Sequence, residues 1–155
     1  GWSPGRAGWR RAGRPARERV IQDVEVPLER LAEFLTWFDT EVGMRPVWLC
    51  PVVARGAANG GRWPLYPMAP GRIWVNLGFW GTVPVGPDAP NAPVNRAIEA
   101  KVIDLGGHKS LYSEAYFDRA TFDRLYNGSH LAAVKARTDP DGRLTTLYDK
   151  AVRRR

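Results

Sequence analysis

Two stretches of the sequence alternate aromatic side chains with polar side chains that could take part in chemistry. In the segment 109–116, Tyr112, Glu114 and Tyr116 occupy every second position. The segment 72–80 carries a second alternating set, formed by Trp74, Asn76 and Trp80. Alternate residues of a β-strand share one face. If both strands present these residues on the same face of a sheet, that face is a binding surface rather than an ordinary solvent-exposed one.

Glu114 is the candidate acid of these sets. A carboxyl group walled by aromatic rings loses hydration, which raises its pKa and suits it to donate a proton or anchor a polar group; a solvated strand glutamate is the alternative. Asn76 could orient a ligand or hydrogen-bond to neighbouring backbone. Cys50 is either a buried packing thiol or part of a pocket wall. Lys109 begins the same segment as Glu114, where a solvated lysine is the simpler interpretation.

Several kinds of site find no support in the sequence. His108 and His130 lie far apart, with no cysteine or carboxylate at metal-ligand spacing, so no metal site is expected. The glycines at 56, 60 and 61 lie in a Pro/Arg-containing loop rather than between a strand and a helix, which argues against a nucleotide-phosphate loop. With a single cysteine, the chain cannot form an internal disulfide.

The net charge of +7 is concentrated at the two ends of the 155-residue chain. Residues 1–19 contribute +5 and residues 150–155 contribute +4, which leaves −2 for residues 20–149. A basic face on the folded part would indicate a nucleic-acid binder, so no specific nucleic-acid partner is expected. The basic ends could still touch anionic lipid at a membrane surface.

The order of the expected elements predicts the fold. Strands are expected at 20–26, 45–53, 72–80 and 109–116, with one helix from Pro27 to just before Gly43 and another at about 93–105. This is the ferredoxin-like βαββαβ order, an α+β fold with an antiparallel sheet and both long helices on one face. Asp118 and Ser129 are expected to cap two shorter helices, the second at 130–137, and a last helix at about 146–152 completes a helical C-terminal extension.

The ends and the long loop complete this organisation. Residues 1–19 are expected to form a basic disordered tail or linker, and residues 20–155 a single domain. Residues 54–71 form a long Gly/Pro-rich loop. The sequence contains neither an apolar run of the roughly 20 residues that cross a bilayer nor a secretory signal. We therefore expect a cytoplasmic location, with peripheral membrane contact through the basic ends as the alternative.

Four blocks of the sequence resemble a known family. They are 20–27 (VIQDVEVP), 46–51 (PVWLCP), 111–116 (LYSEAY) and 147–150 (LYDK). Together, in this order, they resemble the C-terminal portion of the Δ24-sterol reductase family, which are FAD-linked oxidoreductases of the vanillyl-alcohol oxidase superfamily. The resemblance covers about residues 18–152. The run 135–144 (KARTDPDGRL) is also similar to a C-terminal signature of the wider superfamily, which includes sugar and alditol oxidases.

The resemblance implies a role for this chain within a two-part enzyme. In the family, an N-terminal domain holds most of the FAD, and a C-terminal cap domain closes over the isoalloxazine ring and shapes the substrate pocket. Residues 20–155 resemble the cap (substrate) domain, and the FAD-binding domain of a parent chain would be its partner. The pyrophosphate-binding segment is missing from this sequence, so we expect the chain alone to bind FAD weakly or not at all. NADPH is a candidate electron donor.

The family also implies a chemistry, in which reduced FAD gives hydride from N5 to an alkene carbon and a protein acid protonates the neighbouring carbon. Related sugar oxidases carry a histidine–tryptophan–glycine–lysine block near the flavin, which the segment 109–114 lacks, whereas the acid of the sterol reductase pattern falls at Glu114. This favours a bulky apolar substrate, sterol-like or lipid. Glu114 and Tyr112 are the candidate catalytic residues. The other residues expected to face substrate or cofactor are Trp48, Cys50, Trp74, Asn76, Trp80, Lys109 and Tyr116.

Two alternatives stay open from the sequence. The chain could be an inactive cap fragment of a split gene, which the upstream coding region would reveal. It could also be a non-enzymatic ferredoxin-like binding module, since RNA-recognition domains share the βαββαβ order. The strand at 20–26 lacks an aromatic residue, however, and the strand at 72–80 lacks the Gly-Phe-containing consensus of those domains.

Overall fold

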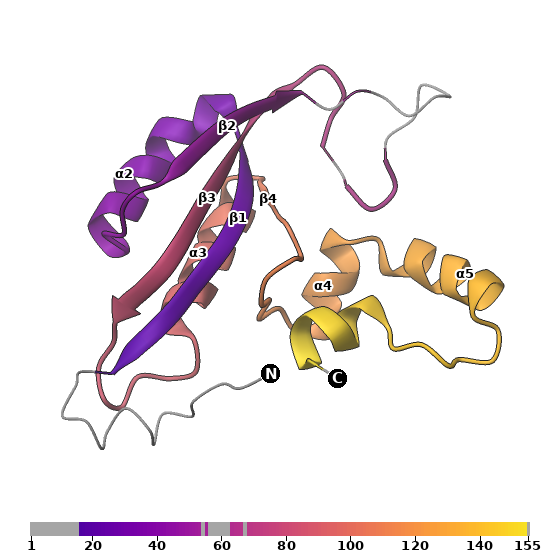
Figure 1. Cartoon of the computed structure of the whole chain (residues 1–155). Helices are drawn as coiled ribbons and strands as arrows, with labels where there is room; N and C mark the ends of the chain where they lie inside the picture. Colours follow the sequence, from indigo (N-terminus) through magenta and orange to yellow (C-terminus); the bar gives the residue numbers. More distant parts are fainter. Residues whose placement is uncertain (1–15, 54, 56–62, 67, 155) are drawn as a thin grey trace.

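The computed structural model describes residues 16–53, 55, 63–66 and 68–154. Its centre is a four-stranded antiparallel sheet with the strand order β2-β3-β1-β4 (Figure 1). The strands are β1 (Arg17–Pro27), β2 (Trp48–Val53), β3 (Ile73–Pro84) and β4 (His108–Lys109). Because β3 lies between β1 and β2 and runs antiparallel to both, the β1-helix-β2 unit is split in the ferredoxin-like manner. The predicted α+β fold class is confirmed.

Helices follow the strands in the expected order. The first is the 3-10 turn η1 (Leu28–Arg30) followed by α2 (Leu31–Glu41), and α3 (Pro93–Asp104) precedes β4. Both pack against the same side of the sheet (Figure 1). The C-terminal part contains α4 (Arg119–Leu125), α5 (Gly128–Thr138) and the π-helix η2 (Asp149–Arg153). Within the described ranges, no helix combines the length and the apolar character that crossing a membrane requires.

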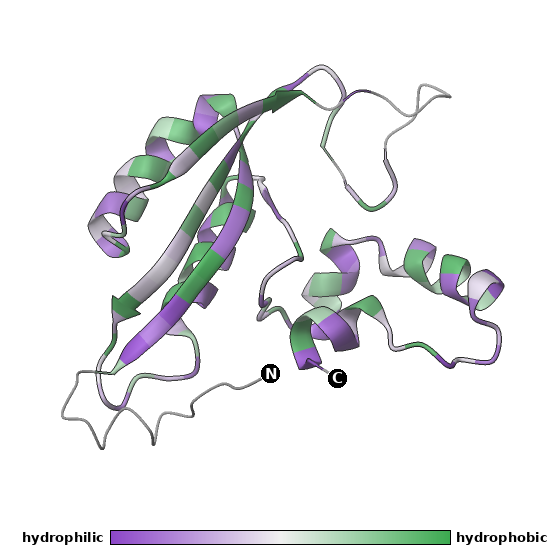
Figure 2. Ribbon diagram, in the orientation of Figure 1, coloured by the Kyte–Doolittle hydropathy of each residue, from purple (hydrophilic) through white to green (hydrophobic). Residues whose placement is uncertain are grey.

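The main core lies between the sheet and helices α2 and α3. Every second residue of the central strands points into it, so that hydrophobic and hydrophilic residues alternate along β1 (Figure 2). Phe38 of α2 packs against Phe79 of β3, with ring centroids 4.7 Å apart and the rings tilted by 46°. Burying a side chain of this size contributes roughly 1.5–3 kcal/mol. The core therefore fixes which side of each strand is left without helices.

A second apolar cluster holds the C-terminal part together. It is formed by Ala115, Phe117, Phe122, Tyr126, Tyr148 and Ala151. Asp118 caps α4 as predicted, because its carboxylate accepts a hydrogen bond from the Thr121 backbone N–H at 2.7 Å. This cluster places η2 opposite the segment that follows β4.

The fourth strand differs from the prediction. Only His108 and Lys109 pair with β1, and residues 110–118 follow an irregular path. Lys109 Nζ donates to the Glu114 carbonyl at 3.0 Å and to Ser113 Oγ at 3.3 Å, which folds the segment back on itself. Beyond it, the Ala115 N–H donates to the Ala151 carbonyl at 3.3 Å. The predicted strand at 109–116 was wrong because contacts with the C-terminal cluster override the local alternation.

Several boundaries also differ from the prediction: β3, for example, continues to Pro84 rather than ending at residue 80. β1 begins at Arg17, so residues 17–19 belong to the sheet, where the Glu18 carboxylate accepts the Val94 and Asn95 backbone N–H groups at the start of α3. Residues 1–15 of the expected tail lie outside the described residues, as do residues 54, 56–62 and 67 of the expected loop 54–71. In α5 the cap is Asn127 rather than Ser129, because the Asn127 side chain accepts from the His130 N–H.

Candidate functional site

The side of the sheet opposite α2 and α3 carries most of the predicted site residues. In the β1–β3 register, Ile21 pairs with Trp80, Asp23 with Gly78, and Glu25 with Asn76. Residues directly opposite each other in an antiparallel pair project to the same side. The helix-free face, as we call it here, includes Ile21, Asp23, Glu25, Trp48, Cys50, Val52, Trp74, Asn76, Gly78 and Trp80.

Three exposed rings form an aromatic platform at one end of the helix-free face. The rings of Trp48 and Trp80 lie 6.1 Å apart and are tilted by 34°. Trp80 Nε1 donates a hydrogen bond of 2.9 Å to the Tyr112 hydroxyl, so the structure brings these two predicted residues together. Each of the three side chains is 50–57% exposed. Exposed rings with polar edges suit a flat apolar ligand.

Gly78 makes the position of Trp80 possible. A Cβ atom at Gly78 would stand 2.5 Å from Cη2 of the Trp80 ring and 2.6 Å from Asp23 Oδ1. The indole therefore occupies the space that any other residue at position 78 would fill.

The opposite end of the helix-free face is closed. Trp74 is buried, with the Arg72 guanidinium 5.0 Å from its ring centroid. Asn76 Nδ2 donates to Glu25 Oε1 at 2.8 Å, and Ser110 Oγ donates to the same oxygen at 3.1 Å. Cys50 lies half-buried on the edge strand β2. Trp74 and Asn76 thus support the face from within rather than extending the exposed platform.

Glu114 has a different environment from the one expected. It forms ion pairs with Arg19 at 2.5 Å and with Arg154 at 3.2 Å, and Tyr116 donates a hydrogen bond of 2.7 Å to it. Partial burial on its own would raise the pKa of Glu114, but the Tyr116 hydroxyl and the two guanidiniums outweigh it and lower the pKa. The expected raised pKa was wrong, and an ionised Glu114 is poorly suited to donate a proton.

Lys109 and Glu99 position the segment that carries Tyr112. Lys109 is buried rather than solvated, and burial lowers its pKa despite the nearby carboxylates, first among them Glu99. Burial raises the pKa of Glu99 to about 7, and its carboxylate accepts the Tyr116 backbone N–H at 3.0 and 3.2 Å. These two buried groups hold the two ends of the segment 110–116, and Tyr116 itself contacts Glu114 rather than the helix-free face.

Asp23 is a site residue that the sequence reasoning missed. It lies on the helix-free face opposite Gly78, and its Oδ1 is buried with no hydrogen-bond partner among the described residues. Burial raises the pKa of Asp23, against the opposing effects of a hydrogen bond from Tyr112 and the charge of Lys109. The alternation of Asp23 and Glu25 with the buried valines of β1 was the available signal, since it places both acids on the side away from the helices.

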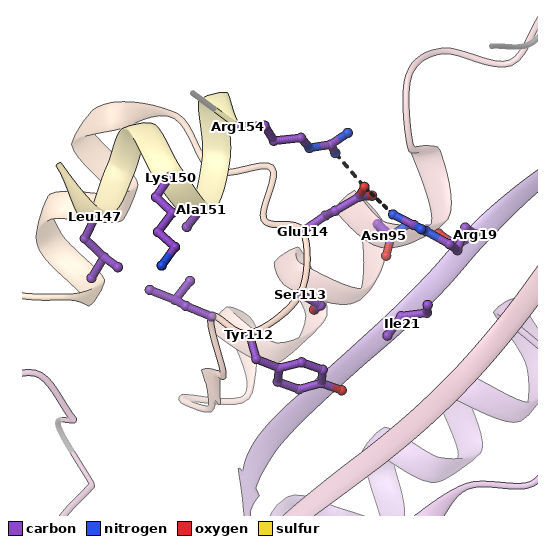
Figure 3. A pocket seen from close by; sticks show the side chains of 11 residues that line it. Arg19, Ile21, Asn95, Tyr112, Ser113, Glu114, Leu147, Lys150, Ala151 and Arg154 are labelled. Atoms are coloured by element: carbon purple, nitrogen blue, oxygen red, sulfur yellow. Dashed lines mark hydrogen bonds and ion pairs between the residues drawn. The ribbon is translucent and has the colours of Figure 1, made fainter. Parts of the chain in front are cut away.

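A pocket of about 510 Å³ adjoins the platform (Figure 3). The β1–η2 pocket, as we call it, lies between β1, the segment 111–114 and η2, where the chain leaves the sheet after Lys109. Its apolar lining is formed by Ile21, Leu111, Leu147 and Ala151, and its charged lining by Arg19, Glu114, Lys150 and Arg154. Tyr112 lines this pocket and also bonds to Trp80, so it connects the pocket with the helix-free face.

The remaining titratable groups do not form a metal centre. His108 is packed between the rings of Tyr66 and Tyr126, and burial lowers its pKa to about 4. Within the part of the chain that the structure describes, no three His, Cys, Asp or Glu side chains gather as ligands.

Comparison with known proteins gives a consistent set of relatives. The Delta(24)-sterol reductase of Rattus norvegicus is 24% identical over 143 residues, and the Delta(24)-sterol reductase homolog dhcr-24 of Caenorhabditis elegans is 27% identical over 137 residues. The chain is similar to the Δ24-sterol reductases. The Arabidopsis thaliana Delta(24)-sterol reductase is 25% identical over 148 residues. These matches cover 85–88% of this chain, which confirms the resemblance seen in its four sequence blocks.

The chain spans about a quarter of the length of these curated relatives. No family model matches it, and no solved structure matches it significantly.

Proposed function

We propose that this chain is the substrate-covering cap of a flavin-linked reductase that acts on a bulky apolar, sterol-like or lipid molecule. The similarity to Δ24-sterol reductases supports the reaction class. The observation that carries the substrate class is the apolar lining of the β1–η2 pocket, which lies beside the aromatic platform. Flat apolar molecules bury well against such surfaces.

The helix-free face suits one part of FAD and not the other. The exposed rings of Trp48 and Trp80, with the unpartnered Asp23 Oδ1 beside them, fit a wall against a flat ring system that has polar edges. Within the described residues, no glycine-rich turn between a strand and a helix offers the backbone N–H cradle that a pyrophosphate needs. Trp48 and Trp80 would therefore lie against the flavin ring, and a separate FAD-binding domain of the parent protein would hold the rest. NADPH stays a candidate electron donor.

Different residues of this chain would then have different roles in the reaction. A bound flavin supplies the hydride for reduction of a carbon–carbon double bond, whose second carbon needs a proton. Tyr112 is the candidate to hold that proton, because its hydroxyl lies at the junction of the pocket and the platform. Glu114 would position the pocket wall instead, through Arg19 and Arg154.

The two alternatives keep distinct expectations. An RNA-binding module is disfavoured because Asp23 and Glu25 place carboxylates on the helix-free face, where phosphates would be repelled. An inactive cap fragment would share this fold and its platform but would have no flavin domain to cover.

The proposal is tested with the longest natural reading frame that contains this chain. We expect the purified protein to show flavin absorbance and to reduce a Δ24-unsaturated sterol, with a gain of two hydrogens detected by mass spectrometry. Tyr112→Phe should lower turnover by about 100-fold with unchanged flavin content. Tyr148→Phe serves as the matched control, since its ring belongs to the C-terminal cluster. A protein without flavin, or one with flavin that leaves the sterol unchanged, contradicts the proposal.

A further inference from the structure

We infer that the β1–η2 pocket binds an apolar molecule that carries an anionic group, such as a sulfate, phosphate or carboxylate. Treating this molecule as the substrate rests on the proposed function. The inference goes further by predicting that, within this apolar substrate class, molecules with an anionic group bind more tightly than neutral ones.

The charged side chains of the pocket do not balance one another. Arg19 and Arg154 both pair with the same carboxylate, that of Glu114, at 2.5 and 3.2 Å. That carboxylate is ionised at neutral pH, because its hydrogen bond and its two guanidinium partners keep its pKa low. The cluster of these three side chains therefore keeps one excess positive charge.

Lys150 adds a second positive charge, which no acidic side chain of the pocket lining neutralises. Among the described residues, Lys150 Nζ has no hydrogen bond and no ion pair, unlike the other cations of the pocket. Figure 3 shows its side chain leaving η2 and pointing across the pocket toward the segment that holds Tyr112. Arg19, Lys150, Arg154 and Glu114 together give the lining a net charge of +2.

Lys150 is solvent-exposed, and several of the pocket residues around it are apolar. Leu147 and Ala151 lie on the same turn as Lys150, and Leu111 and Ile21 line the opposite side. A neutral apolar occupant would displace water from the ammonium group and give it no partner, which is unfavourable. An occupant with an anionic group would pair with Lys150 while its apolar body covers the leucines, and that attraction strengthens as water leaves.

The geometry also orients such a ligand. Lys150 lies on the C-terminal side of the pocket, whereas Tyr112 lies where the pocket meets the aromatic platform. An anionic group on Lys150 would therefore direct the far end of the molecule toward Tyr112 and Trp80.

The test uses the 155-residue chain and two probes, cholesterol sulfate and cholesterol, each delivered from the same cyclodextrin carrier and measured by equilibrium dialysis. We expect cholesterol sulfate to bind about tenfold more tightly than cholesterol. Lys150→Met, which keeps the apolar stem of the side chain, should remove this preference. Arg137→Met is the matched control: it removes one positive charge from α5, outside the pocket, and should keep the preference. Urea unfolding of each variant confirms that the fold is retained.

The outcomes separate this inference from the proposed function. Equal affinities for the two probes, unchanged by Lys150→Met, overturn the anionic group but leave an apolar substrate site in place. A preference for the sulfate that survives Lys150→Met, at low or at high salt, places the anion away from Lys150 and overturns the inference. If neither probe binds, both the inference and the substrate site of the proposed function fail.

Discussion

The packing of Trp80 over Gly78 predicts a measurable cost for adding a single methyl group. In Gly78→Ala the new Cβ would stand 2.5 and 2.9 Å from two carbons of the Trp80 ring and 2.6 Å from Asp23 Oδ1. Carbon atoms in contact normally stay about 3.5–4.0 Å apart, so the ring must move. We expect overpacking to cost about 1–3 kcal/mol. The better backbone propensity of alanine returns roughly 0.5–1 kcal/mol of this.

The net loss in the free energy of unfolding should therefore be about 0–2.5 kcal/mol, with a central value of about 1 kcal/mol. Because Trp80 is half-exposed, the ring can swing outward, and this breaks its hydrogen bond to Tyr112. Urea unfolding measures the stability, and the indole N–H resonance of Trp80 reports the hydrogen bond.

Two further variants make the prediction specific. Gly86→Ala is the control, since nothing lies within 4 Å of a Cβ at that position, and its effect should stay within about 0.5 kcal/mol. In the background of Trp80→Ala, the cost of Gly78→Ala should largely vanish. The reasoning is refuted if Gly78→Ala is as stable as Gly86→Ala and leaves the Trp80 indole resonance unchanged.

Four other predictions follow from the described contacts. Asn127→Ala should lose about 1–2 kcal/mol in urea unfolding, because it removes the cap of α5 and leaves alanine at φ 53°, whereas Ser129→Ala should be nearly neutral. Lys109→Met should cost about 3 kcal/mol and increase amide exchange across residues 110–116; unchanged exchange would show that Lys109 does not hold that segment. Burial raises the pKa of Glu99 from 4.5 to about 7, so this group binds more protons in the folded state, and its contribution to stability is lost as the pH rises through that window. Burial lowers the pKa of His108 from 6.5 to about 4, so the contribution of His108 to stability is lost as the pH falls through that window. Glu99→Gln should therefore make urea midpoints rise more steeply between pH 4.5 and 6.5 than in the wild type, and an unchanged slope would argue against the raised pKa. The 155-residue chain alone should not quench FAD fluorescence saturably at submicromolar concentration, and saturation there would contradict a separate FAD-binding domain.

The sheet could be predicted from the sequence where local pattern and tertiary packing agree. The strands β1 and β3 and the two long helices have apolar residues at the period of their own element, and those residues form the main core. The segment 109–116 has an equally regular alternation. It fails to form a strand because the buried Lys109 and Glu99, together with the Ala151 carbonyl, determine its path. Those partners are not visible in a local pattern.

Some features of the candidate site could likewise be predicted from the sequence, and others could not. The aromatic residues Trp80 and Tyr112 could be proposed from their types alone, and the structure brings them into contact. The environment of Glu114 could not be predicted from the sequence, because its partner Arg19 lies 95 positions away in the chain. Asp23 gains its interest only from its pairing with Gly78 across the sheet. Alternation assigned the faces, but only the register shows which residues meet on them.

The account depends on the helix-free face and the adjoining pocket being the surface that meets the substrate. The most direct measurement is a titration of the ¹⁵N-labelled chain with cholesterol sulfate, followed through the tryptophan indole N–H resonances. The account predicts that Trp80 shifts, because its N–H donates to the Tyr112 hydroxyl that lines the pocket, whereas Trp37, which packs against the main core from α2, does not. A shift at Trp37 with Trp80 unmoved would place the ligand on the helical side of the sheet and contradict the central claim.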